Sequence, residues 1–175
     1  MSTLAVNAVQ NLSGGHSITG MGKILQVQSA TKSDTFSIAT TMNGTAGFSD
    51  ITGMTVNITP SSTSSKIMVW AISRVSCPNH ANTRLVRGST GIAIGDADGN
   101  RTRTSTGEQY NCGDSYMSQD SPIMYLDSPS STSTLTYKLQ IACASTAYFN
   151  RIENDSNALN YSRPACTITV MEVAA

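Results

Sequence analysis

The chain has 175 residues, of which 39% are hydrophobic and only 13% are charged, and its formal net charge is zero. That length fits one domain with a real core, with room for a short arm. A neutral chain has no long-range field toward nucleic acid or anionic lipid, so we expect neither nucleic-acid binding nor membrane insertion. Ser, Thr and Asn supply the polarity, and they suit strands and turns better than exposed helix faces.

The start of the chain differs from the rest. A short apolar stretch from Leu4 to Val9 is followed by a glycine break at Gly14 and Gly15. After Gly22, short strand-like runs alternate with Gly, Ser, Asn and Pro clusters, and no segment keeps a helical period. We therefore expect an N-terminal attachment arm at residues 1–21 and an antiparallel β-sandwich, jelly-roll-like, at residues 22–175.

Two strands are predicted in the first half of that domain. Residues 54–59 alternate between apolar and polar side chains and stop at Pro60, which cannot donate to a strand ladder. Residues 66–72 are apolar on both faces. This second strand is therefore expected to be central in a sheet or to have one face covered by a partner.

The middle of the chain predicts a hairpin and a long loop. Two strand-like runs within residues 82–95 meet at Gly88-Ser89-Thr90-Gly91, which indicates a glycine-dependent turn. Residues 96–120 are polar and poor in apolar side chains. We expect a long loop there, and long loops in compact domains are functional or mobile.

Two further strands are predicted near the end. In residues 135–143, Leu, Tyr, Leu, Ile and Cys face one way while Thr, Lys and Gln face the other. Residues 166–173 alternate similarly, and a strand so late in the chain is expected to belong to the sheet. Cys143 and Cys166 fall inside these strands and are expected to be buried thiols, whereas Cys77 and Cys112 fall in loops. The even number of cysteines permits disulfides, and nothing in the sequence requires them.

Five runs are familiar in combination: ITPSSTSSKIMV at 58–69, RLVRGST at 84–90, GDA at 95–97, LDSP at 126–129 and TITVMEV at 167–173. Together they resemble a module of tail-fibre and related virion proteins of phages that infect marine and cyanobacterial hosts. The likeness covers most of residues 22–173. It implies a virion location after assembly in the bacterial cytoplasm, a homotrimer, and attachment to other virion proteins through the N-terminal arm.

One loop segment has the composition of a cation site. Asp96, Asp98 and Asn100 place oxygen ligands on alternate positions of a tight turn, which is an arrangement that calcium accepts. Arg101 and Arg103 follow where further oxygens should stand. We therefore favour a polar turn over a bound Ca²⁺ ion, and no other cofactor is expected.

The long loop also has the composition of a sugar-binding or receptor-binding site. Tyr110, Asn111, Asp114 and Tyr116 combine rings for stacking with groups that contact hydroxyls. The alternative is that both tyrosines pack back against the sheet. Trp70 and Tyr137 lie in strands patterned for the core and are expected to pack there. Trp70 is also a candidate subunit contact, since its strand is apolar on both faces.

Two arginines on a predicted hairpin strand, Arg84 and Arg87, are expected to pair with carboxylates of a neighbouring subunit. Catalysis is not expected. His16 and His80 have no triad setting, and the hairpin turn is not a nucleophile elbow. A glycoside hydrolase needs two carboxylates close together, for which Asp114, Asp120 and Asp127 are the candidates.

The resemblance therefore implies a phage virion structural protein, a tail-fibre subunit that assembles as a trimer and can contact the host surface. A head or neck decoration fibre, or a capsid-binding virion protein, is one alternative. A non-catalytic carbohydrate-binding module is another alternative. A small polysaccharide depolymerase is the enzyme hypothesis, and it ranks below the others.

Overall fold

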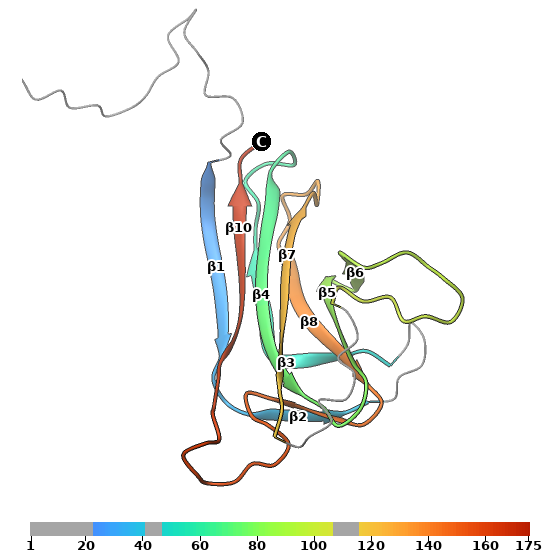
Figure 1. The fold of residues 1–175 in the computed structure, drawn as a ribbon. Coiled ribbons are helices and arrows are strands. Elements are labelled where there is room, and N and C mark those ends of the chain that lie inside the picture. Colours follow the sequence, from blue (N-terminus) through green and yellow to red (C-terminus); the bar gives the residue numbers. More distant parts are fainter. Residues whose placement is uncertain (1–22, 41–46, 107–115) are drawn as a thin grey trace, which may run out of the picture.

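The computed structural model describes residues 23–40, 47–106 and 116–175, and this part of the chain is built from strands without a helix (Figure 1). The predicted arm at residues 1–21 lies outside the described residues. The strands are β1 (Ile24–Lys32), β2 (Phe36–Ala39), β3 (Ser49–Ile58), β4 (Lys66–Ser76), β5 (Ala81–Arg87), β6 (Thr90–Ile92), β7 (Gln119–Asp127), β8 (Leu135–Cys143), β9 (Thr146–Phe149) and β10 (Cys166–Val173).

The strands form two antiparallel sheets, which confirms the predicted β-sandwich. In the first sheet β1, β10, β4 and β7 lie side by side in that order (Figure 1), and the short β9 and β2 extend it beyond one end of β4. The second sheet has the order β3-β8-β5-β6. The orders β1-β10-β4-β7 in the six-stranded sheet and β3-β8-β5-β6 in the four-stranded sheet have the connectivity of a jelly roll.

Alternation along the strands explains the core between the sheets. Ile67, Val69 and Ala71 point inward from β4, and Leu139 and Ile141 point inward from β8; all are fully buried. Full burial of such a side chain contributes roughly 1.5–3 kcal/mol. The sandwich therefore depends on the alternation that predicts β3, β8 and β10.

Several sequence predictions are confirmed in detail. β3 ends at Ile58, before Pro60, and β4 is central because it pairs with β10, β7 and β9. β10 lies between β1 and β4 as an integral strand. The hairpin β5–β6 turns at Gly88, whose φ of 61° lies in the left-handed region that favours glycine.

The predicted loop at residues 96–120 is corrected at its end, because Gln119 and Asp120 already belong to β7. Pro122 lies inside β7, and a proline argues against a strand when the sequence is considered alone. A proline is tolerated there because β7 is an edge strand that pairs with β4 alone among the described strands. Residues 107–115 of this loop lie outside the described part.

The two ends of the described chain lie together at one end of the sandwich (Figure 1). The backbone N–H of Ala174 donates to the carbonyl of Lys23 at 2.8 Å, so β1 starts where β10 finishes. The connection between β9 and β10, residues 150–165, lies at the opposite end. The domain thus has one end near residues 23 and 175 and another end formed by loops.

Candidate functional site

The outward side of the first sheet is apolar across four strands. Val27 of β1 lies opposite Met171 of β10, Met171 lies opposite Met68 of β4, and Met68 lies opposite Leu126 of β7. Paired residues in a sheet share a face. Two residues further along β4 and β7, and therefore on the same face, Trp70 lies opposite Met124. We call this surface the apolar face; its members are Ile24, Val27, Met68, Trp70, Met124, Leu126 and Met171.

The apolar face is open to solvent in the single chain. Exposure reaches 58% for Trp70, 75% for Met124, 52% for Val27, 54% for Ile24 and 42% for Leu126. A contiguous group of large exposed apolar side chains marks an interaction surface, in contrast to single exposed ones. The prediction that Trp70 packs in the core is therefore wrong. Side chains alternate along a strand, so Trp70 points outward because its neighbours Val69 and Ala71 point inward.

Charge is confined to the ends of this surface. Along β4, Met68, Trp70 and Ile72 stand outward between Lys66 at one end and Arg74 at the other. The outward neighbours between those ends on β1, β10 and β7 are uncharged: Ser29, Thr31, Thr167, Thr169, Pro122 and Met124. A matching partner surface must be uncharged too, because burying an unpaired charge is costly.

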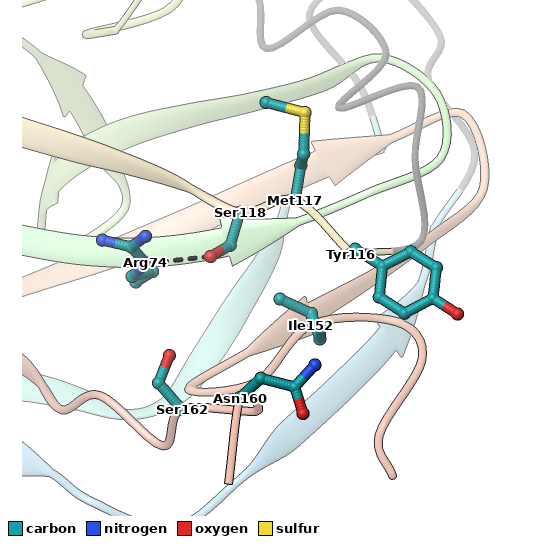
Figure 2. A pocket seen from close by; sticks show the side chains of 7 residues that line it. All are labelled: Arg74, Tyr116, Met117, Ser118, Ile152, Asn160 and Ser162. Carbon is teal, nitrogen blue, oxygen red and sulfur yellow. Dashed lines mark hydrogen bonds between the residues drawn. The ribbon is translucent and has the colours of Figure 1, made fainter. Parts of the chain in front are cut away.

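A pocket adjoins the Arg74 end of the apolar face (Figure 2). Its volume is about 260 Å³. Three segments form it, namely β4, the residues just before β7, and the connection between β9 and β10. The lining side chains are Arg74, Tyr116, Met117, Ser118, Ile152, Asn160 and Ser162.

The guanidinium of Arg74 has one partner in the pocket wall, Ser118, and one outside it, Asp120. Its Nε donates to Ser118 Oγ at 2.9 Å, and its Nη1 donates to both carboxylate oxygens of Asp120 at 3.1 and 3.2 Å. These bonds fix the arginine and balance its charge. The remaining wall consists of neutral groups: hydroxyls, an amide, a thioether, an aliphatic side chain and an aromatic ring.

Of the four predicted ligand-binding residues, Tyr116 lies in this pocket, whereas Tyr110, Asn111 and Asp114 lie outside the described residues. The Tyr116 side chain is 54% exposed, and its ring lies 6.0 Å from the ring of Tyr161, tilted by 50°. The sequence analysis missed Asn160 and Ser162. Nothing in the sequence links them to Tyr116, which lies 44 positions before Asn160; only the fold brings these residues together.

The predicted cation ligands Asp96, Asp98 and Asn100 lie in an exposed loop. Asp98 forms an ion pair with Arg101. Within the described part of the chain, no three His, Cys, Asp or Glu side chains gather as a metal cluster. Calcium binding at the loop stays a prediction.

Both predicted interface arginines have partners in their own chain. Arg84 Nε donates to Gln140 Oε1 at 2.9 Å, and its guanidinium lies 4.0 Å from the ring centre of Phe48. Arg87 Nη1 lies 2.6 Å from Asp127 Oδ2. Their pairing with a neighbouring subunit stays a prediction.

The carboxylates considered for glycoside hydrolysis are not adjacent. Asp120 and Asp127 lie near opposite ends of β7, about 23 Å apart along an extended strand. Carboxylate pairs in glycosidases are within about 10 Å. Asp114 lies outside the described residues. Asp120 and Asp127 therefore cannot serve as that pair.

Cys77, Cys143 and Cys166 are buried, and Cys143 and Cys166 are free thiols. This confirms the expectation for Cys143 and Cys166. Cys77 follows the end of β4, in a loop as expected, but is buried. Burial raises the pKa of Cys166, so its unreactive thiol form is favoured. Cys112 lies outside the described residues.

Fold and surface together define the class: a jelly-roll β-sandwich with an unpartnered apolar sheet face and a neutral pocket beside it. No family model matches the sequence, and no curated protein is significantly similar to it. Within the described residues there is also no helix of the length and apolarity needed to cross a membrane.

Proposed function

We propose that this chain is a phage virion structural protein, a fibre subunit that assembles with copies of itself as a trimer. The observation that carries the proposal is the apolar face, in which Met124 and Trp70 are the most exposed side chains. A second copy of the chain offers the uncharged surface that this face requires. Trimeric stoichiometry comes from the resemblance to tail-fibre proteins.

The energetics favour association. A large apolar side chain moved from water into a packed interface contributes roughly 1–2 kcal/mol when it starts half-exposed. Five such side chains on each subunit give a hydrophobic centre of the kind that dominates obligate interfaces. Met68, Met124 and Met171 add flexible side chains that fit irregular gaps.

The shape of the domain supports a fibre. β1 begins at one end of the sandwich, and the β9–β10 connection lies at the other (Figure 1). That connection carries Ile152, Asn160 and Ser162 of the pocket wall. A subunit attached to the particle through residues 1–21 would present the pocket end outward. That end would meet the host surface or the next virion protein.

Light scattering of the purified full-length chain at micromolar concentration tests the assembly. We expect three times the 18.4 kDa mass of the chain. The double variant Trp70→Ser with Met124→Ser should be a folded monomer. Leu159→Ser, which removes a fully exposed apolar side chain outside the apolar face, should keep the wild-type mass.

A monomeric wild-type chain at these concentrations would contradict the proposal. The virion location has a separate test in immunoelectron microscopy of phage particles with an antibody to this chain. Label on fibres is the expected result. Particles that contain none of this chain would refute a structural role.

A further inference from the structure

The pocket between Arg74, Tyr116 and Asn160 has the composition of a small carbohydrate site, and we propose that it binds a neutral saccharide. Its volume of about 260 Å³ lies just below the range of about 300–1,000 Å³ that drug-sized ligands occupy. A site of this size holds one sugar unit, with the remainder of a chain outside. The proposal rests on the pocket and not on the apolar face.

The wall of the pocket matches the two surfaces of a sugar ring. A pyranose has an apolar C–H side, which stacks on aromatic rings, and a rim of hydroxyls that both donate and accept. Tyr116 supplies a half-exposed ring, and Ile152 and Met117 extend the apolar wall. Asn160 supplies an amide donor and acceptor, and Ser118 and Ser162 supply hydroxyls (Figure 2).

The charge of the pocket favours a neutral ligand over an anionic one. Among the described residues that line the pocket, only Arg74 is charged, and Asp120 accepts two hydrogen bonds from the Arg74 Nη1. A phosphate, sulfate or uronic acid would have to compete with that carboxylate for the guanidinium. A sugar hydroxyl need not do so, and it can accept a hydrogen bond from Ser118, whose Oγ accepts from Arg74 Nε.

The segment that carries Asn160 and Ser162 is held in place. Asp155 accepts from Arg163 Nη2 at 2.7 Å and lies 3.8 Å from Arg151 Nη1. At the start of the segment, the Asn150 amide donates to the carbonyls of Lys32 and Asp34. A pre-ordered wall loses little entropy on binding, which favours measurable affinity for a small ligand.

The test is binding to an array of neutral hexose and N-acetylhexosamine oligosaccharides printed beside sialylated and sulfated ones, followed by calorimetry with the best neutral oligosaccharide. We expect selective binding to neutral glycans. Tyr116→Ala and Asn160→Ala should each weaken it about tenfold, from the lost ring stacking or amide hydrogen bonds. Tyr116→Phe keeps the ring and should bind within about threefold of wild type.

The matched control is Leu159→Ala, next to Asn160 but with a fully exposed side chain that does not line the pocket. It should bind like wild type. Binding to no neutral glycan, selective binding to acidic glycans, or affinities unchanged in Tyr116→Ala and Asn160→Ala would each overturn the proposal. Light scattering on the same samples separates this result from the assembly, because a trimer without sugar binding refutes only the pocket and a sugar-binding monomer refutes only the fibre.

Discussion

The hydroxyl of Tyr137 on β8 donates to Asp127 Oδ2 on β7 at 2.6 Å, and this bond joins the two sheets of the sandwich. The same carboxylate oxygen accepts from Arg87 Nη1 on β5, also at 2.6 Å. Tyr137 and Asp127 are both buried. Burial and the neighbouring Asp127 carboxylate raise the pKa of Tyr137 far above its usual value, so the phenol keeps the proton that it donates.

Removing this link should destabilise the fold without changing its shape. Tyr137→Phe loses one hydrogen bond to a charged acceptor, which costs about 2 kcal/mol of unfolding free energy. Asp127→Ala leaves both the Tyr137 hydroxyl and the half-buried Arg87 without their acceptor and should cost about 3 kcal/mol. Urea unfolding followed by circular dichroism measures both.

The control for these two variants is Arg101→Ala, which breaks a surface ion pair with Asp98. The side chains of Arg101 and Asp98 are both exposed, so the expected loss of unfolding free energy is below about 0.5 kcal/mol. A Tyr137→Phe variant that unfolds at the wild-type urea concentration would show that the link between the sheets contributes nothing.

A second prediction concerns acid stability and Glu172, a fully buried carboxylate on β10. Burial alone would raise its pKa, but hydrogen bonds from Gln26 and from the Ser61 hydroxyl and amide outweigh burial and lower the pKa to about 2. Its usual value is 4.5. Between these two values the unfolded chain binds more protons at this group than the folded one, so its stabilising contribution is lost as pH falls.

The measurement is the urea midpoint from pH 6 to pH 2. Wild type should lose stability below about pH 4.5. The Glu172→Gln variant should be less stable than wild type at pH 6, and its stability should change less with pH below about pH 4.5. Asp34→Asn, at a carboxylate that is largely exposed, should keep most of the wild-type dependence. Equal pH slopes for wild type and Glu172→Gln would contradict the assignment.

Asn150 gives a third prediction, because it combines a left-handed backbone with buried hydrogen bonds. Its φ is 57°, and its amide donates to two main-chain carbonyls. Asn150→Gly should lose about 2 kcal/mol from those bonds, and Asn150→Ala about 1 kcal/mol more because alanine is strained at positive φ. Thermal unfolding should therefore rank wild type above Gly and Gly above Ala; the reverse order for Gly and Ala would argue against backbone strain.

Much of the fold follows from local pattern. Alternation alone predicts β3, β8 and β10, and Gly88 predicts the hairpin. The four-residue strands β2 and β9 are too short for a periodic signal, and Pro122 masks β7. Local pattern says which side chains alternate, but it does not say which strands are neighbours.

The candidate sites likewise combine features that local pattern predicts with contacts that depend on strand order. The strand at residues 66–72 is apolar on both faces, and this pattern alone predicts a central strand or a covered face; β4 is central and has an outward apolar side. Tyr116 could be singled out by its neighbours in sequence. The contacts of Arg87 with Asp127, and the grouping of Tyr116 with Asn160, depend on strand order and cannot be found by spacing.

The last prediction uses Trp70 as a reporter, since it is the only tryptophan in the chain and belongs to the apolar face. In the proposed assembly its ring would be buried against a second copy, so its fluorescence should be blue-shifted and poorly quenched by acrylamide. Dilution below the dissociation constant should shift the emission to the red and increase quenching, because the ring is half-exposed in the single chain. Met124→Ser, which removes the residue opposite Trp70, should move this transition to higher concentration, whereas Leu159→Ser should not. Emission and quenching that stay those of an exposed ring at every concentration would place Trp70 outside any interface.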